Sequence, residues 1–154
     1  MPEAVIVAMA RSPIGRAHKG SLKDMRADDL LVQMVDAALR QVPGLDPASI
    51  DDIMVGCAQP AGEQGYNLAR HVAIGIGLDG VPGTVVQRYC ASSVQTTRMA
   101  LHAIKAGEGH TFISAGVECV SRYGLGKSDG MEGTHNPRYA PAEARTSARS
   151  GAGA

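Results

Sequence analysis

Apolar residues along the first 121 positions occur in two patterns, continuous short runs and helical repeats. Continuous apolar runs suit strands that are buried on both faces of a parallel sheet, and they occur at 4–9, 53–57, 84–86 and 110–115. Between these runs, apolar residues recur at three- and four-residue steps, which predicts helices over 28–42, 68–76 and 90–106. The alternation of strands and helices predicts an α/β fold whose mainly parallel sheet is covered by helices.

The unit formed by the third strand, its turn and the third helix carries the candidate chemistry. The turn begins at Gln87, and we expect Cys90 to be the first residue of a helix that ends at Gly107. The unpaired N–H groups and the dipole at a helix N-terminus favour an anion. A thiol placed there can have its pKa lowered, and the thiolate is the nucleophile. The alternative is a small buried core cysteine, which is the usual environment of a free cysteine.

Composition and charge narrow the class of protein. Apolar residues make up 44% of the 154 positions and charged residues 19%, which is typical of a globular domain. The 15 basic and 15 acidic residues balance, so no net attraction to nucleic acid or an anionic membrane is expected. There is no apolar run of membrane-spanning length and no signal-peptide pattern, which predicts a reduced, cytoplasmic setting.

The three cysteines, Cys57, Cys90 and Cys119, are widely spaced and form no C-x-x-C pair. This spacing indicates neither a zinc site nor a disulfide framework, so we expect no metal and no bound cofactor. Cys57 lies near the end of the second strand and is expected to be structural. A redox role for Cys90 is a further possibility, but the sequence places no resolving cysteine near it.

Several motifs occur in an order that resembles the thiolase family of CoA-dependent acyltransferases. Residues 87–93, Gln-Arg-Tyr-Cys-Ala-Ser-Ser, resemble the family's nucleophile segment Asn-Arg-x-Cys-x-Ser-Gly, with Gln87 in place of Asn and Ser93 in place of Gly. Residues 11–15 resemble Arg-Thr-Pro-x-Gly, residues 67–70 resemble Asn-x-Ala-Arg, and residues 115–121 resemble Gly-Gly-Met-Glu-Ser-Met-Ser through Gly116, Glu118 and Ser121. Glu118 is expected to be a structural, hydrogen-bonded carboxylate.

The resemblance covers about residues 4–146 and implies the N-terminal βαβαβαβ half of the thiolase fold. It implies a domain core at 1–121, the start of a loop region that covers the acyl-CoA at 122–146, and a flexible tail at 147–154. It also implies that Cys90 attacks an acyl-CoA to form an acyl-cysteine, for thiolysis of a 3-ketoacyl-CoA or the reverse Claisen condensation. CoA and acyl-CoA would be substrates within fatty acid metabolism, and no residue is assigned to bind them.

The family reaction also needs a His from a Gly-His-Pro segment and a Cys from a Cys-x-Gly segment, and the sequence contains neither. His102 and His110 are poor substitutes, because a helix from Cys90 to about residue 106 is roughly 24 Å long. His135 lies in a loop that can fold back, and Cys119 is a remote second candidate for a proton carrier.

Two alternatives therefore stay open beside the acyltransferase. One is a catalytically incomplete fragment, or a non-catalytic subunit whose partner supplies the C-terminal half. An exposed half-fold would leave apolar surface uncovered, so a homo-oligomer or such a partner is expected. The other is a relative of the ketoacyl synthases, which also place a cysteine at a helix start. The motif at 11–15 and the segment with Glu118 favour the thiolase resemblance.

Overall fold

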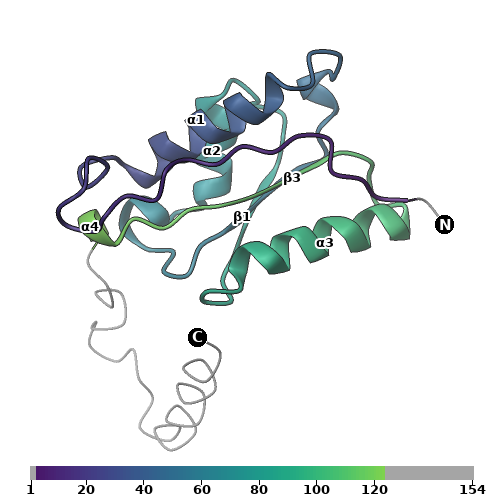
Figure 1. Ribbon diagram of the computed structural model, residues 1–154. Coiled ribbons are helices and arrows are strands. Elements are labelled where there is room, and N and C mark those ends of the chain that lie inside the picture. The colour runs from purple at the N-terminus through teal and green to yellow at the C-terminus, as the bar shows by residue number, and fades with distance from the viewer. Residues whose placement is uncertain (1–2, 124–154) are drawn as a thin grey trace, which may run out of the picture. The chain divides into compact units, whose positions relative to one another are not determined.

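The computed structural model describes residues 3–123 of the chain (Figure 1). The chain divides into two units, Met1–Gly124 and Leu125–Ala154, and the described residues all belong to the first. Most of the expected loop region, the expected tail at 147–154 and His135 lie outside the described residues. The helices within the described residues are all too short or too polar to span a membrane.

Three parallel strands form the centre of the described unit. They are β1 (Asp52–Gly56), β2 (Gly83–Val86) and β3 (Phe112–Gly116), in the spatial order β2-β1-β3. Ile53 pairs with Gly83 on one side of β1, and Asp52 pairs with Phe112 on the other. The α/β class and the parallel sheet expected from the sequence are confirmed.

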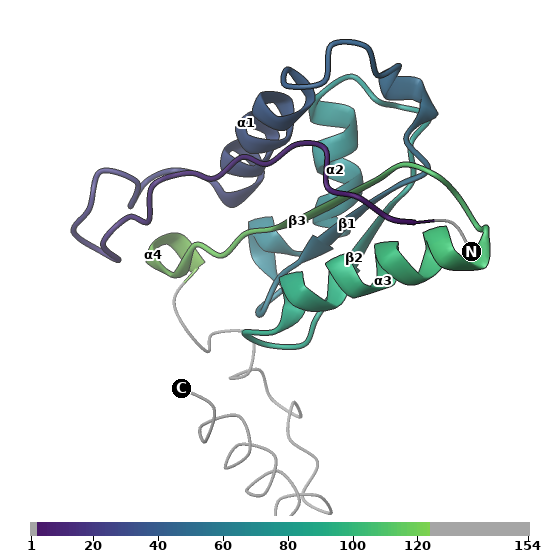
Figure 2. The same cartoon turned by 45° about the vertical axis from the view of Figure 1, so that its right-hand side comes forward.

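Helices cover both faces of this sheet. Figure 2 shows α1 (Ala27–Leu39) and α2 (Leu68–Gly75) on one face and α3 (Ser92–Ala106) on the other. Short helical turns complete the unit, namely η1 (Pro47–Ser49), η2 (Gly62–Gln64) and α4 (Val120–Tyr123). The hydrophobic core lies between the sheet and the first two helices, and its buried members include Leu31, Val35, Ile53, Val55, Leu68 and Val72.

The helix ends follow from local chemistry. The first turn of α1 contains Asp28 and Asp29, whose carboxylates complement the positive end of the helix dipole. At the start of α2, the side chain of Asn67 accepts a hydrogen bond from the N–H of Arg70. At the end of α3, Gly107 adopts φ 77°, the left-handed conformation that closes a helix at little cost for glycine.

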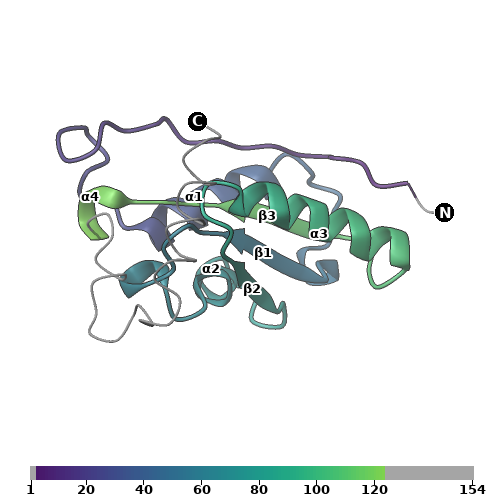
Figure 3. The ribbon, with the colours of Figure 1, turned by 90° about the horizontal axis from the view of Figure 1, so that it is seen from below.

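The strand expected at 4–9 does not form, which corrects that part of the prediction. This segment has no strand pairing, and the side chains of Val5, Ile6, Val7 and Met9 are 66–76% exposed. It is held by Gln41, whose side-chain amide exchanges hydrogen bonds with the backbone of Met9. Figures 1 and 3 show the segment running along the β3 side of the sheet. An apolar run favours a strand, but a strand also needs the hydrogen-bonding edge of a neighbour.

Candidate active site

Cys90 lies in the turn that joins β2 to α3, at the carboxyl end of the parallel strands. This end of a parallel sheet is where α/β proteins place their ligands. Cys90 is exposed, whereas Cys57 is buried and Cys119 is partly buried. The helix begins at Ser92, two residues later than the sequence predicted, because residues 88–91 form a tight turn before it. Cys90 therefore precedes the helix N-terminus and is not its first residue.

The turn around Cys90 is held in one conformation by its neighbours. Tyr89 has φ 45°, a left-handed conformation that is uncommon for a bulky side chain and that stores strain. The hydroxyl of the buried Ser92 compensates, because it donates to the carbonyl of Tyr89 over 2.6 Å and accepts from the N–H of Arg88 over 2.8 Å. These bonds fix the backbone on both sides of Cys90.

Two further contacts anchor the same turn to its surroundings. The side-chain amide of Gln87 donates to the carbonyl of Ala58, which follows β1, over 3.1 Å. The Arg88 guanidinium donates to the side-chain carbonyl of Gln95 on α3 over 2.7 Å. Gln87, which stands where the motif usually has Asn, thus ties the nucleophile turn to the loop after the central strand.

Glycines at the ends of two strands let α3 approach the sheet closely. A Cβ atom on Gly56 would lie 2.5 Å from the backbone nitrogen of Ser93 and 2.6 Å from the carbonyl carbon of Ser92, well inside contact distance. A Cβ atom on Gly116 would lie 1.9 Å from the hydroxyl oxygen of Ser93. Ser93, which stands where the motif usually has Gly, is therefore accommodated because Gly116 carries no side chain.

A polar network lies beside this turn, around the end of β1. Gln64 is fully buried; its amide donates to the carboxylate of Glu118 over 2.7 Å, and its carbonyl accepts from the N–H of Cys119 over 2.5 Å. The other oxygen of Glu118 accepts from the N–H of Ala58 over 2.8 Å and lies 3.7 Å from the sulfur of Cys57. Glu118 is thus a hydrogen-bonded structural carboxylate, as the sequence predicted.

Cys57 has the environment of an inert thiol. Only 1% of its surface is exposed. Burial raises the pKa of this thiol to about 12, and the negative charge of Glu118 acts in the same direction. Because the thiolate is the reactive form, Cys57 is structural, as predicted from its position at the end of a strand.

Gln64 is the member of this network that the sequence did not reveal. It lies in a loop of glycine and polar residues that shows no periodicity. The available signal was weak: a Gly-Glu-Gln-Gly stretch is compatible with a short helical turn, but nothing in it indicates burial.

Within residues 3–123, no histidine is hydrogen-bonded to Cys90. The backbone N–H of His110 donates to Asp51, which places it at the amino end of the strands, opposite Cys90. His102 is exposed on α3, and the ring of His71 packs against that of Tyr66. Within residues 3–123, no group of three His, Cys, Asp or Glu side chains is arranged to hold a metal ion.

Comparisons with known proteins agree with these motifs. The family model described as thiolase, N-terminal domain, matches residues 4–145. A β-ketoadipyl-CoA thiolase of Acinetobacter baylyi is 44% identical over 136 residues, which are 86% of this chain and 34% of that protein. A 3-ketoacyl-CoA thiolase of Bacillus subtilis is 43% identical over 79% of this chain and 31% of its own length.

The solved structures include a matching fold. The crystal structure of the Bacillus anthracis acetyl-CoA acetyltransferase superposes with a TM-score of 0.70 and 32% identity. That match covers 76% of this chain and 29% of the solved chain. The chain thus spans about a third of the length of the curated relatives it matches.

Proposed function

Because the chain belongs to the thiolase family, we propose that it carries the nucleophile of a thiolase-type acyltransferase and that Cys90 is this nucleophile. The observation that carries the proposal is the contrast between an exposed Cys90 in a fixed turn and a buried Cys57 whose pKa is raised. The location at the carboxyl end of a parallel sheet supports it, since substrates can approach there.

The proposed first step is acyl transfer from CoA to the cysteine. The Cys90 thiolate attacks the carbonyl carbon of an acyl-CoA, and the carbonyl oxygen becomes an oxyanion that accepts hydrogen bonds from backbone N–H groups, including that of Cys90 itself. When this intermediate collapses, the bond to the CoA sulfur breaks and CoA leaves as a thiolate, which then takes up a proton. An acyl-cysteine remains, and one thioester has replaced another.

The proposed second step removes the acyl group. CoA takes it in the thiolytic direction, and an acyl-CoA enolate takes it in the condensing direction. Both directions need an acid or base close to Cys90, and the described residues offer no histidine bonded to it. We place that group in the part of a thiolase that lies beyond the third spanned here. CoA and acyl-CoA enter as substrates, and no separate cofactor is proposed.

The proposed biological setting follows the names of the relatives. One relative is named a β-ketoadipyl-CoA thiolase and another a 3-ketoacyl-CoA thiolase. We propose an acyl-CoA substrate, a role in fatty acid or related acyl-CoA metabolism, a cytoplasmic location and an oligomeric assembly.

The second candidate function is a catalytically incomplete fragment or a non-catalytic subunit. It is favoured by the length of the match, since the chain covers only about a third of each of these relatives. In this case a partner that supplies the C-terminal half would complete the site.

Acylation of the purified chain separates these candidates. After incubation with acetyl-CoA, peptide mass spectrometry should find the acetyl mass on Cys90 and on neither Cys57 nor Cys119. The matched control is Cys90→Ala, which should lose the adduct while its thermal melting curve is unchanged. If a folded wild-type chain acquires no adduct, the chain alone does not perform the first step and the second candidate holds. An adduct on Cys119 alone would reject the assignment of the nucleophile.

A further inference from the structure

The orientation of Cys90 depends on the backbone of the turn that carries it. Within residues 3–123, neither the exposed thiol of Cys90 nor its N–H has a hydrogen-bond partner. The thiol is the proposed nucleophile, and the N–H is a proposed donor to the oxyanion. Both reacting groups of this residue are therefore oriented by the peptide groups on either side of it, and the side chains that hold those peptide groups decide where they point.

The peptide group between Tyr89 and Cys90 is held by Ser92. Its carbonyl accepts one hydrogen bond from the hydroxyl of Ser92 over 2.6 Å and another from the N–H of Ser92 over 3.1 Å. This peptide bond is trans, and a trans peptide group is planar with its C=O and N–H pointing in opposite directions. Because the carbonyl points toward the first turn of α3, the N–H of Cys90 points away from that turn and is free to bind a ligand.

The hydroxyl of Ser92 also compensates the strained backbone of Tyr89. The left-handed φ of 45° gains little support from packing, because the Tyr89 side chain is 54% exposed. Ser92 itself is only 3% exposed, and its hydroxyl accepts from the N–H of Arg88 over 2.8 Å while it donates to the carbonyl of Tyr89. One buried hydroxyl thus bridges the backbone groups on both sides of the strained residue.

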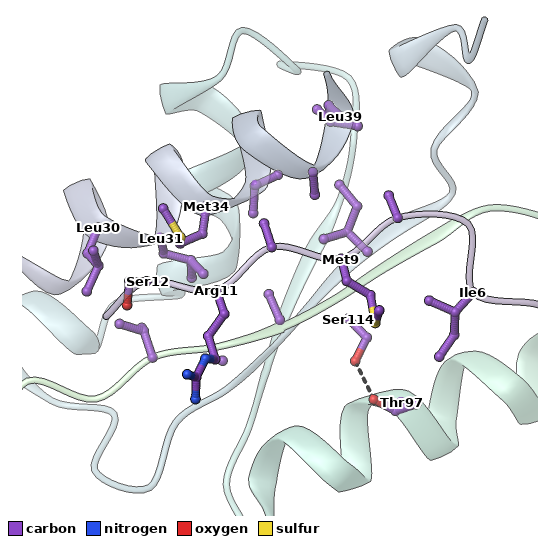
Figure 4. Close-up of a pocket in the computed structure, with 18 of the residues that line it drawn as sticks. Ile6, Met9, Arg11, Ser12, Leu30, Leu31, Met34, Leu39, Thr97 and Ser114 are labelled. Atoms are coloured by element: carbon purple, nitrogen blue, oxygen red, sulfur yellow. Dashed lines mark hydrogen bonds between the residues drawn. The ribbon is translucent and has the colours of Figure 1, made fainter. Parts of the chain in front are cut away.

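Ser92 can hold this turn because α3 is fixed to the sheet. In the next helical turn, the hydroxyls of Thr96 and Thr97 each lie 2.9 Å from the hydroxyl of Ser114 on β3. Figure 4 shows Thr97 and Ser114 facing each other beside the cavity that β3 lines. The missing side chain of Gly56 also lets the backbone of Ser92 lie against the end of β1. The position of Ser92 is therefore set by two strands.

We propose that Ser92 is the positioning residue for acyl transfer, a role that rests on the proposed function of Cys90. Through the carbonyl of Tyr89, Ser92 orients the N–H of Cys90 toward the oxygen of the bound acyl group. When the Cys90 thiolate bonds to the carbonyl carbon, the electron pair of the C=O bond moves to this oxygen, and the N–H stabilises the resulting oxyanion until the leaving group departs. Ser92 acts through the peptide group and not on the substrate.

Two reagents that both consume the Cys90 thiolate separate this role from a purely structural one. 4-Nitrophenyl acetate transfers its acetyl group through an oxyanion and releases 4-nitrophenolate. Iodoacetamide alkylates the sulfur and releases iodide, and no oxyanion forms. A changed pKa of the thiol alters both rates, so the ratio of acetylation to alkylation reports on the oxyanion.

We expect this ratio to fall at least about tenfold at Cys90 in Ser92→Ala, since a preorganised donor to the oxyanion is lost. Peptide mass spectrometry over time gives both rates in the full 154-residue chain. Ser92→Thr keeps the hydroxyl and should retain the wild-type ratio. Ser93→Ala is the matched control, because it removes an exposed hydroxyl from the same turn of α3 and should leave the ratio unchanged.

The wild-type chain provides a second measurement if Ser92→Ala does not fold. Unfolding in urea should lower the ratio at Cys90 by at least about tenfold, because the N–H of Cys90 is then no longer oriented. An unchanged ratio in folded Ser92→Ala, or equal ratios in the native and unfolded wild-type chain, would overturn the proposal. An equal fall in Ser92→Thr would also overturn it, because the hydroxyl would then not be responsible.

These reagents also separate this proposal from the proposed function. Neither reagent requires a site for CoA, so both rates are measurable even if acetyl-CoA leaves no adduct on Cys90. In that case the function proposed for the chain alone fails, and the ratio still decides the role of Ser92. If acetyl-CoA acylates Cys90 but the ratio is the same in Ser92→Ala as in the wild type, the positioning role alone fails.

Discussion

Cys57 and Cys90 follow neighbouring strands of one sheet, yet their environments are opposite. Cys57 comes directly after β1, where it is buried and lies 3.7 Å from the carboxylate of Glu118 in the segment after β3. Cys90 comes four residues after β2, at the exposed end of a strained turn. Both cysteines follow strands of the same sheet, so the difference in the exposure of their thiols comes from the loops that follow each strand. The loop after the central strand β1 buries its cysteine, and the loop after the edge strand β2 exposes its cysteine.

The loops also differ in what they stabilise. Around Cys57, Gln64 and Glu118 bond each other and the backbone of two segments, one after β1 and one after β3, which closes the end of β1. Around Cys90, Ser92 and Gln87 fix the backbone but leave the thiol free. The polar network that buries Cys57 is thus adjacent to the turn that exposes Cys90. Gln87 connects the two through its hydrogen bond to the carbonyl of Ala58.

The largest expected effect is in the rate of thiol alkylation. A thiol with a pKa of about 12 is ionised in about one molecule in ten thousand at pH 8. Iodoacetamide should therefore modify Cys90 at least about a hundredfold faster than Cys57 in the native chain at pH 8. Peptide mass spectrometry over time gives both rates, and unfolding in urea is the control that should equalise them. Comparable native rates would mean that the loops do not distinguish the two cysteines.

The second prediction concerns the network that buries Cys57. Gln64→Leu keeps the volume of this fully buried side chain and leaves the N–H of Cys119 and an oxygen of Glu118 without a partner. We expect the free energy of unfolding to fall by about 3 kcal/mol. The matched control is Gln41→Leu, which removes an exposed glutamine whose amide donates to two backbone carbonyls, and it should cost less than about 1 kcal/mol. Urea denaturation measures both, and equal losses would contradict the role of burial.

The third prediction concerns the support of the Cys90 turn. Gly56→Ala places a methyl group against the backbone of Ser92 and Ser93, which cannot move without displacing α3. We expect a loss of about 2 kcal/mol in the free energy of unfolding, together with a changed rate of Cys90 alkylation. Gly80→Ala is the control, because nothing lies within 4 Å of its added methyl and its φ is ordinary. Unchanged stability in Gly56→Ala would mean that α3 does not depend on this approach.

The sequence predicted the parts of this arrangement that depend on local pattern. Helix periodicity located α1, α2 and α3 to within two or three residues at each end, and Gly107 was correctly identified as the stop of α3. The parallel sheet followed from the alternation of strands and helices. The turn between β2 and α3 was predicted correctly, but Cys90 was expected to be the first helical residue and lies in the turn instead. Cys57 and Glu118 were correctly assigned structural roles.

The parts that depend on distant partners were not predictable. The run at 4–9 has strand composition, but whether it pairs depends on what lies beside it, and a cavity separates it from β3. The burial of Gln64 depends on Glu118 and Cys119, which are more than fifty residues away in sequence. The left-handed backbone of Tyr89 was not evident either, because it is stabilised by the hydroxyl of Ser92 and not by a glycine.

The smallest expected effect tests the same contrast at the amino end of β1, where two adjacent acids have opposite surroundings. Burial raises the pKa of Asp52, and one of its oxygens is buried without a partner in the described residues. The backbone N–H groups of Thr111 and His110 lower the pKa of Asp51. Asp52 therefore stabilises the fold below its unfolded pKa, and this contribution is lost as the pH rises through its raised folded pKa. Asp51 stabilises the fold above its unfolded pKa, and this contribution is lost as the pH falls through its lowered folded pKa.

At pH 7, Asp52→Asn should raise the free energy of unfolding by a few tenths of a kcal/mol, because an ionised and partly buried carboxylate is removed. Asp51→Asn should lower the free energy of unfolding, because the neutral amide cannot make the charge-assisted hydrogen bonds that Asp51 makes with the backbone N–H groups of Thr111 and His110. Urea denaturation between pH 3 and pH 7 measures both signs. On acidification the wild-type advantage over Asp51→Asn should shrink, and the deficit relative to Asp52→Asn should shrink as well. If both substitutions changed the free energy of unfolding in the same direction at pH 7, Asp51 and Asp52 would not have the opposite environments described here.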